Sequence, residues 1–276
     1  MLRRLRKQLP DPVKRRMRRM RAQFLSLDLP IKADFFQPEE EKKASADMSV
    51  VVPFRDVAIR VFERCLSSLG RYAPEAEIIL VDDGSVRKET AEIVARYISR
   101  YHWKLVRNET SKGHSRASEA GGREATRPYL CLLNSDAIVT PWSWRAAQEA
   151  FEADPKIGIS GPTTSQTPTP QMNRRAELCR HFWTDSQVFG FAEKSVKPWA
   201  PGTIVELPEV GGFAFFIRRS LWEQLEGFDP NLPDYGNEFE LCRRVLARGW
   251  KIVWTKRSYI HHLGQQDYID PTSEWL

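Results

Sequence analysis

The sequence predicts an α/β protein with a doubly wound, mainly parallel central sheet and helices on both of its faces. Short apolar runs alternate with longer amphipathic patterns from residue 48 to residue 153, as in successive βαβ units. Three of these runs, at residues 49–52, 78–81 and 129–133, lack a helical period and are typical of strands buried on both faces. Polar residues follow each run at once. Because parallel strands place such ends along one edge of a sheet, we expect a ligand site at that edge.

The composition is that of a globular protein with a hydrophobic core. The chain has 276 residues, of which 41% are hydrophobic, enough for one large or two small domains. No apolar run reaches the length of about 18 residues that a transmembrane helix needs, and the first residues lack the apolar centre of a secretory signal. The four cysteines form no C-x-x-C pair, which argues against a disulfide framework or a zinc site. We therefore expect a reduced, cytoplasmic protein.

The first 27 residues predict a basic amphipathic helix. Residues 1–21 hold ten arginines and lysines and one acid, so the net charge of +6 comes from this tail and the rest of the chain is mildly acidic. Apolar residues recur at spacings of three and four, on one helical face: Val13, Met17, Met20, Phe24 and Leu27. Such a helix can lie on an anionic membrane surface, or its apolar stripe can pack on the domain. A nucleic-acid partner is not expected, because no recognition motif accompanies the charge.

Composition and periodicity then divide the remaining chain. Residues 37–47 are charged and read as a linker, which separates the tail and linker, residues 1–46, from a domain over residues 47–276. The first half of this domain is predicted to contain a strand at 103–106 and helices that end near 69 and span about 87–101 and 114–126. The second half is predicted to contain helices at 141–153, about 219–225 and 237–248, and strands at 157–162, 210–217 and 251–254. Residues 163–205 are predicted to be irregular, and their aromatic residues suit either a sugar-stacking acceptor loop or ordinary anchoring of that loop.

Two strand ends carry acids that could bind a ligand. Asp82 and Asp83 follow one apolar run, and Asp136 follows another. A polar turn would explain either stretch alone. Two adjacent carboxylates repel each other, however, which suggests a ligand that donates hydrogen bonds to them. Lys112 and Gly113 precede a predicted helix and suit an anionic diphosphate.

These motifs resemble, in order and spacing, those of the family 2 glycosyltransferases. The matching stretches are residues 51–53, 81–85 and 133–136, and Lys112-Gly113 with Ala117 and Gly121. The resemblance implies the GT-A fold, with a nucleotide-binding half at residues 47–140 and an acceptor and catalytic half at residues 141–276. It also implies a donor site made of Pro53, Arg55, Asp82, Asp83, Lys112, Gly113, Ser135, Gly211 and Gly212.

The resemblance further implies a divalent cation, Mn²⁺ or Mg²⁺, on the diphosphate of the donor. Asp136 stands at the last position of the family's Asp-x-Asp element, in which Asn134 replaces the first Asp and removes one charge. A histidine completes the metal site in many of these enzymes. Both His261 and His262 fit that position, and His262 is preferred.

Two glutamates near the C-terminal end match the family's catalytic acid motif. The segment reads Asn-Glu-Phe-Glu-Leu here, where the family has Glu-Asp-x-Asp-Leu. By position, Glu238 corresponds to the catalytic base and Glu240 to a supporting acid. Without the resemblance, both would be read as acids favourably placed near a helix N-terminus.

The sequence thus predicts a metal-dependent, inverting glycosyltransferase, a hexosyltransferase or a related enzyme. Its expected substrates are a nucleotide-diphosphate sugar and a saccharide or lipid-linked acceptor, in the synthesis of surface glycans or glycoconjugates. The departures at Asn134 and residues 237–240 leave open a non-catalytic binding or scaffold protein on the same fold. A sugar-phosphate nucleotidyltransferase is less favoured, because no Gly-rich, basic triphosphate loop lies near the first strand.

Overall fold

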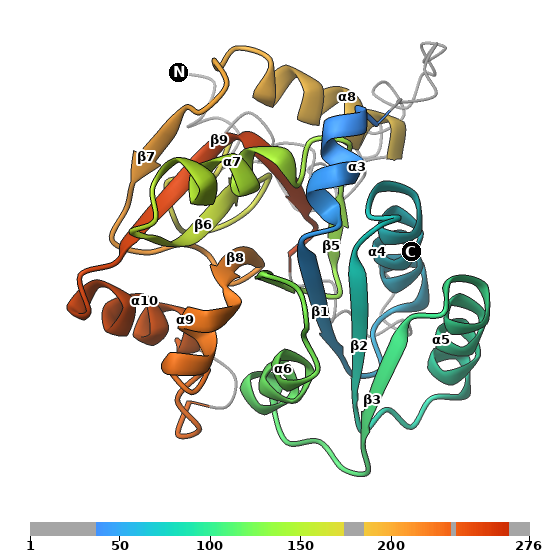
Figure 1. Cartoon of the computed structure of the whole chain (residues 1–276). Helices are drawn as coiled ribbons and strands as arrows, with labels where there is room; N and C mark the ends of the chain where they lie inside the picture. The colour runs from blue at the N-terminus through green and yellow to red at the C-terminus, as the bar shows by residue number, and fades with distance from the viewer. Residues whose placement is uncertain (1–36, 174–184, 233–235, 265–276) are drawn as a thin grey trace, which may run out of the picture.

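Nine strands form one sheet in the part of the chain that the computed structural model describes, residues 37–173, 185–232 and 236–264 (Figure 1). They are β1 (Met48–Phe54), β2 (Glu77–Asp83), β3 (Lys104–Asn108), β4 (Tyr129–Leu133), β5 (Ala137–Val139), β6 (Ile157–Thr163), β7 (Ile204–Glu206), β8 (Ala214–Arg218) and β9 (Lys251–His262). The order across the sheet is β3-β2-β1-β4-β8-β6-β9-β5, and β7 also pairs with β9.

Helices pack on both faces of this sheet. They are α3 (Glu39–Ser45), α4 (Ile59–Tyr72), α5 (Lys88–Tyr101), α6 (His114–Arg123), α7 (Arg145–Ala153), α8 (Asp185–Val196), α9 (Arg219–Gln224) and α10 (Asn237–Ala247). Figure 1 shows α4 and α5 beside the parallel half of the sheet, with α9 and α10 beside the other half. The alternation of strands and helices in the first half agrees with the apolar pattern of the sequence.

The sheet changes character at its middle. β3, β2, β1 and β4 run parallel, and Val50 of β1 aligns with Ile78 of β2 and Cys131 of β4. β8 runs antiparallel to both of its neighbours, β4 and β6, while β6 and β9 are parallel. The predicted α/β class is confirmed, and the sheet is parallel in the first half and mixed in the second. Because β1, β2 and β4 are parallel neighbours, their C-terminal ends share one edge.

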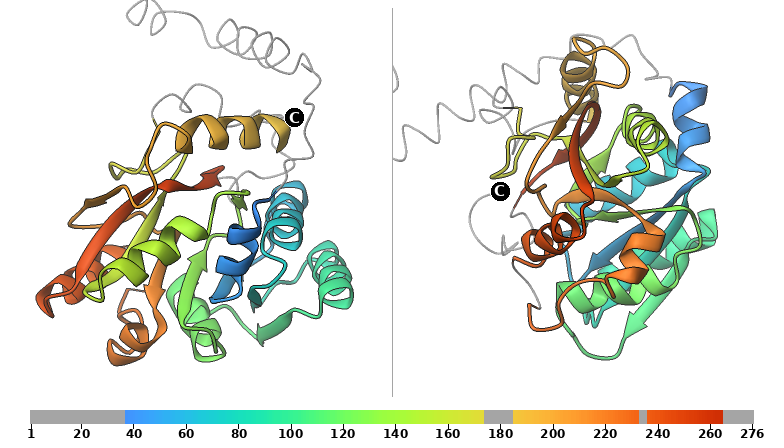
Figure 2. Two further views of the ribbon diagram at one scale, coloured as in Figure 1. Left: turned by 45° about the horizontal axis from the view of Figure 1, so that its top comes forward. Right: turned by 60° about the vertical axis from the view of Figure 1, so that its left-hand side comes forward.

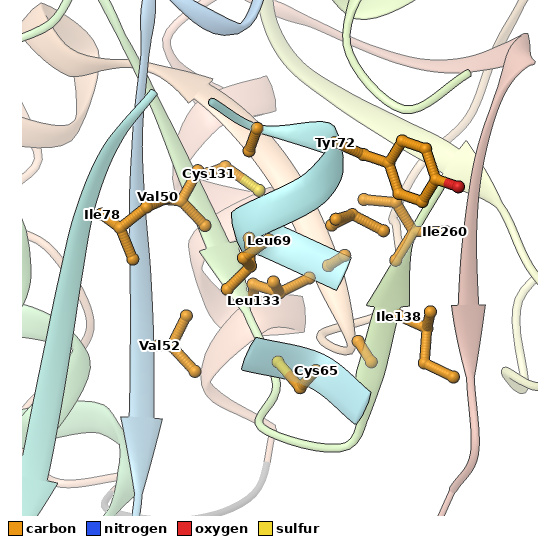
Figure 3. Close-up of a cluster of buried hydrophobic side chains, with 14 of the residues drawn as sticks. Val50, Val52, Cys65, Leu69, Tyr72, Ile78, Cys131, Leu133, Ile138 and Ile260 are labelled. Carbon is orange, nitrogen blue, oxygen red and sulfur yellow. The ribbon is translucent and has the colours of Figure 1, made fainter. Parts of the chain in front are cut away.

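Apolar side chains alternate between two cores, one on each face of the sheet. Val50 and Val52 of β1 belong to one core, and Val51 between them belongs to the other. Figure 3 shows the first core, in which Cys65 and Leu69 of α4 lie over the strands. The second core joins the sheet to α6, α9 and α10 through Ala117, Leu221, Trp222, Leu241 and Val245. Each buried aliphatic side chain contributes about 1.5–3 kcal/mol, so these cores hold the polar strand ends in place.

Residues 37–47 are not the linker that their charge suggested. Most of them form α3, which docks at the start of α7. The buried carboxylate of Glu41 accepts hydrogen bonds from the backbone N–H groups of Trp144 (2.8 Å) and Arg145 (3.0 Å). Burial raises the pKa of Glu41 to about 7. The prediction was wrong because one acid of the run caps a neighbouring helix instead of facing water. Helix α7 itself starts at Arg145, after a turn, and not at residue 141.

The stretch predicted to be irregular, residues 163–205, contains a helix and a strand. Helix α8 lies along β9 (Figure 2), and the ring centroids of Phe191 and Tyr259 are 5.9 Å apart. Gly190 in the middle of α8 masked its helical pattern. Strand β7 pairs with β9, which continues past the predicted end at residue 254 to His262. The three-residue strand β5 was also missed, because it is too short to show a pattern.

The predicted basic helix of the tail lies in residues 1–36, outside the described residues. Among the residues that the structure describes, no helix has the length and apolar character needed to cross a membrane. Three of the cysteines fall within this part, Cys65, Cys131 and Cys242, and all three are buried.

Candidate active site

Asp83 organises the loop that leads into α6. Its carboxylate accepts hydrogen bonds from the Asn108 side chain (2.8 Å), the Ser111 hydroxyl (2.6 Å) and the backbone N–H groups of Lys112 (2.9 Å) and Gly113 (3.1 Å). Burial alone would raise the pKa of Asp83, but these hydrogen bonds outweigh it and hold the pKa below its ordinary value. The carboxylate therefore fixes the segment that the sequence assigned to a diphosphate.

Asp82 faces a different set of groups. One carboxylate oxygen accepts a hydrogen bond from the backbone N–H of Ser85 (2.7 Å), and the other lies 3.7 Å from Nε of Arg107. Arg107 is largely exposed, at 58% of its side chain. Asp82 and Arg107 thus form a pair at the sheet edge, in which Asp82 is as buried as Asp83 and Arg107 is exposed.

The loop after β1 completes this edge of the sheet. Pro53 is buried within β1 and aligns with Val81 of β2, whereas Arg55 just beyond it is exposed. Asp56 has a φ of 45° and accepts backbone hydrogen bonds from Val86 (3.1 Å) and Arg87 (2.9 Å) at the start of α5. These bonds join the β1–α4 loop to the loop that follows β2.

The end of β4 forms a tight, buried turn. The backbone N–H of Asn134 donates to the carbonyl of Phe213 (2.9 Å), and the N–H of Ala137 returns to the carbonyl of Asn134 (3.0 Å). Ser135 is buried, and Asp136 is only 2% exposed. The burial of Asp136 has a plain cause, because strand β5 begins at the next residue and pairs with β9.

His262, and not His261, faces Asp136. Nε2 of His262 lies 3.3 Å from Oδ1 of Asp136, while the backbone N–H of Leu263 donates to the carbonyl of Asp136 (3.1 Å). Successive residues of a strand point to opposite faces, so His261 points away and its Nδ1 lies 3.0 Å from the Tyr259 hydroxyl. Complete burial lowers the pKa of His261 to about 3. Burial alone would raise the pKa of Asp136, but the charge of His262 when protonated and hydrogen bonds, one of them from the backbone of Gly264, hold it below its ordinary value.

Asp136 and His262 have the chemistry of a partial metal site. Oδ1 of Asp136 is a buried atom without a hydrogen-bond donor in the part of the chain that the structure describes. Together with Nε2 of His262 it offers two converging ligand atoms. No group of three or more histidine, cysteine or acidic side chains suited to a metal occurs among the described residues. Two protein ligands fit Mg²⁺ or Mn²⁺ if substrate phosphate oxygens and water supply the remainder.

Glu240 is committed to an ion pair. Both of its carboxylate oxygens accept hydrogen bonds from Arg244, at distances of 2.6–2.8 Å. Arg244 also donates to the backbone carbonyls of Leu225 (2.7 Å) and Gly227 (2.8 Å). The pair therefore ties α10 to the end of α9, and Glu240 serves the architecture of this region.

Glu238 lies against the backbone of Gly212. A Cβ atom at position 212 would stand 2.9 Å from Cδ of Glu238, so the carboxylate reaches this place only because residue 212 is glycine. Burial raises the pKa of Glu238, and the charge of Glu209 adds to this rise, while a hydrogen bond from the Gly212 backbone opposes it. Glu238 is thus a half-buried acid with a raised pKa at the start of a helix.

Contacts join this acid to the Asp136–His262 pair. Phe213 follows Gly212, and its ring stacks on the imidazole of His262 with centroids 5.2 Å apart. Glu238, Gly212, Phe213, His262 and Asp136 therefore form one unbroken series of neighbours.

A second link joins α10 to the Asp83 loop. The buried side chain of Asn237 donates to the Ser115 hydroxyl (2.6 Å), two residues after Gly113. Separately, the backbone N–H of Gly211 donates a hydrogen bond to the side-chain oxygen of Gln171 (2.8 Å). The structure thus gathers the two acidic strand ends and the start of α10 at one edge of the sheet.

Several residues at this edge were not assigned from the sequence. Asn108 ends β3 just as Asp83 ends β2. This fourth polar strand end is the sequence feature from which Asn108 could have been predicted as a site residue. No sequence pattern marked the others as part of the site, since their roles depend on contacts between distant segments: Ser111, Ser165, Gln166, Phe213 and Arg244.

The chain resembles known proteins in sequence. A family model described as "Glycosyl transferase family 2" matches residues 49–225, more than half of the chain. The O-antigen biosynthesis protein RfbC of Myxococcus xanthus is 25% identical over 251 residues, which are 85% of this chain and 19% of RfbC. The inactive polypeptide N-acetylgalactosaminyltransferase-like protein 5 of Macaca fascicularis is 25% identical over 231 residues, 79% of this chain and 52% of that protein. The chain spans about half or less of the length of these relatives.

The fold also resembles that of solved structures. The crystal structure of GalNAc-T7 with UDP, GalNAc and Mn²⁺ matches with a TM-score of 0.58 and 19% identity. The match covers 78% of this chain and 43% of that chain. At this identity the likeness establishes a shared fold and nothing more.

Proposed function

Because the chain belongs to glycosyl transferase family 2, we propose that it is a metal-dependent, inverting glycosyltransferase. It moves a sugar from a nucleotide-diphosphate sugar to an acceptor hydroxyl. The observation that carries this proposal is the series of contacts that runs from Glu238 through Gly212, Phe213 and His262 to Asp136. It puts an acid with a raised pKa and a pair of metal-type ligand atoms at the same edge of the sheet.

The donor nucleotide is proposed to bind between the β1, β2 and β4 ends. Asp82 and the exposed Arg55 line the sheet edge for the nucleoside, and the Asp83-held loop presents Lys112 and Gly113 at the start of α6. The exposed side chain of Lys112 and the positive end of α6 favour an anionic diphosphate there. Pro53, Ser135, Gly211 and Gly212 complete the proposed donor site as close-packed backbone.

Asp136 and His262 are the proposed metal ligands, with Mn²⁺ or Mg²⁺ as the cation. When bound, a divalent cation neutralises the negative charge that develops on the departing diphosphate. An imidazole ligand beside a carboxylate favours Mn²⁺ over Mg²⁺. His261 is not a proposed metal ligand, because its ring faces Tyr259.

Glu238 is the proposed general base. It accepts the proton of the acceptor hydroxyl while that oxygen attacks the anomeric carbon from the face opposite the diphosphate, which inverts the configuration. A base works best when its pKa lies near the working pH, and burial moves the pKa of Glu238 in that direction. A single displacement of this kind needs no enzyme nucleophile.

The acceptor is proposed to be a saccharide or a lipid-linked saccharide. The similarity to a protein of O-antigen biosynthesis supports a place in surface glycan or glycoconjugate synthesis. The basic residues 1–27 would favour an acceptor at an anionic membrane surface. The proposed location is therefore the cytoplasm, at the surface of the membrane.

A non-catalytic binding protein is the second candidate. Asn134 removes one charge from the Asp-x-Asp element, and one relative of this chain is named as inactive. Such a protein would bind the nucleotide without turning over the sugar donor.

Donor hydrolysis separates the two candidates. The full-length chain is incubated with a panel of UDP- and GDP-sugars, with Mn²⁺ or with EDTA, and release of the nucleotide is measured. Thermal shift with UDP and GDP runs in parallel, since a ligand at a hundredfold excess over Kd adds about 2.7 kcal/mol to the apparent stability. Mn²⁺-dependent release supports the enzyme. A nucleotide-induced thermal shift without release supports the binding protein, and pyrophosphate release would indicate a nucleotidyltransferase instead.

A further inference from the structure

The segment Ser165–Gln166 holds His262 from two sides. The Ser165 hydroxyl donates to the backbone carbonyl of His262 (2.7 Å) and accepts the backbone N–H of the same residue (3.0 Å). Ser165 is fully buried, two residues after the end of β6. One hydroxyl thus pairs with both backbone groups of His262, the last residue of β9. It fixes the backbone from which the imidazole side chain extends.

The next residue fixes the ring itself. Nδ1 of His262 lies 2.9 Å from the backbone carbonyl of Gln166. A carbonyl oxygen can only accept, so Nδ1 must carry the hydrogen. The other nitrogen, Nε2, is then the one directed at Asp136, 3.3 Å away. The stacked ring of Phe213 limits rotation of the imidazole out of this plane.

Gly264 makes room for this arrangement. Its φ is +69°, and a Cβ at this position would lie 2.3–2.5 Å from side-chain atoms of Gln166. The positive φ favours glycine at this position, and its lack of a side chain leaves room for the end of the Gln166 side chain. A serine hydroxyl and a backbone carbonyl thus orient one histidine.

We propose that Ser165 and Gln166 are positioning residues that hold His262 in the Nδ1–H tautomer, with Nε2 presented toward Asp136 for a divalent cation. This inference rests on the proposed metal-dependent function and names the residues that set the metal affinity. Groups that orient a metal-ligating histidine in this way typically change metal affinity by about 10–100-fold when they are removed.

The tautomer can be measured without activity. The chain has five histidines, and ¹⁵N-labelled histidine gives distinct nitrogen shifts for the Nδ1–H and Nε2–H forms. We expect neutral His262 of the full-length protein to show the Nδ1–H pattern, and Ser165→Ala to show a mixture of both. An Nε2–H pattern in the unsubstituted protein overturns the inference, whether or not the variant folds.

Metal affinity is the second readout. Binding of Mn²⁺ is measured by electron paramagnetic resonance in the presence of UDP or GDP. Ser165→Ala should raise the Kd for Mn²⁺ by about 10–100-fold. The matched control is Ser49→Ala, which removes a buried hydroxyl that accepts the backbone N–H groups of Thr126 and Arg127 outside the proposed site. This control should leave the Kd unchanged.

The outcomes separate this inference from the function on which it rests. Equal Mn²⁺ affinity in the unsubstituted protein and in folded Ser165→Ala overturns the inference alone. Absence of Mn²⁺ binding by the unsubstituted protein with either nucleotide overturns the metal-dependent function as well. Weakened binding in Ser165→Ala but not in Ser49→Ala supports the positioning role.

Discussion

The ends of β2 and β4, on either side of β1, carry the same kind of acidic signal, yet their carboxylates are used differently. After β2, the oxygens of Asp83 accept hydrogen bonds from two side chains and two backbone N–H groups. After β4, Asp136 is also buried, but its Oδ1 has no hydrogen-bond donor among the described residues and faces His262. A buried carboxylate whose bonding capacity is filled stabilises its own loop. One with capacity to spare is a candidate for binding a ligand.

The same contrast occurs within one helix. Glu240 accepts three close contacts from the guanidinium of Arg244. Glu238, two residues earlier, is half-buried against Gly212, and its pKa is raised. In both comparisons, the fully paired acid belongs to the scaffold, and the other acid is the better candidate for chemistry.

The largest expected effect is that of Asp136→Asn. The change removes the charge at the proposed metal site and should lower Mn²⁺-stimulated donor turnover by at least about 10³-fold, since metal stabilisation of a departing group is worth several kcal/mol. The melting temperature should shift by only about 2–4 °C.

The companion variant Asn134→Asp restores the charge that the family's Asp-x-Asp element has and should tighten Mn²⁺ binding. Unchanged Mn²⁺-dependent turnover in Asp136→Asn would place the metal site elsewhere. The proposed difference in role between Asp83 and Asp136 would then be wrong.

The next effect compares Glu238→Gln with Glu240→Gln. Glu238→Gln removes the proposed base but keeps its shape, and should lower kcat by about 10²–10⁴-fold with little change in donor Kd. Because the pKa of Glu238 is raised, the carboxylate is protonated at a higher pH than usual. The kcat of the unsubstituted enzyme should therefore fall as the pH drops through that pKa, and this acid limb should be absent in Glu238→Gln.

Glu240→Gln should act mainly on stability, by weakening the pair with Arg244. Loss of turnover in Glu240→Gln but not in Glu238→Gln would reverse the two assignments. Loss in neither would show that both glutamates are structural and that the general base is another residue.

The smallest effect on chemistry, and a clear one on stability, is expected for Asp83→Asn. The amide cannot accept all the donors that surround Asp83, so the free energy of unfolding should fall by about 2–3 kcal/mol. The lowered pKa of Asp83 means that its contribution is present above the unfolded pKa and is lost as the pH falls through the folded pKa. Denaturant titrations at pH 7 and near pH 3 should show that the deficit of the variant shrinks in acid. A deficit that stays constant would contradict this role.

The fold was largely predictable from the sequence because its first half is made of local signals. The runs at 49–52 and 78–81 are apolar throughout, and both faces of β1 and β2 are indeed buried. The errors fell where the local pattern was weak or overridden. Gly190 obscured α8, and the charged run at 37–47 became α3 because Glu41 caps α7 from a distance.

The sequence by itself determined the fold class, the family and the positions of the candidate acids, since these depend on short apolar runs and on motifs with fixed spacing. Tertiary structure alone decided which acids are already paired and which histidine meets Asp136. Asp83 is engaged by residues about 25–30 positions away, and His262 by residues about 97 positions away. Hydrogen bonds and ion pairs act only over a few ångströms. The use of each carboxylate is therefore set by which distant segments the two cores bring together, and a linear pattern does not contain that information.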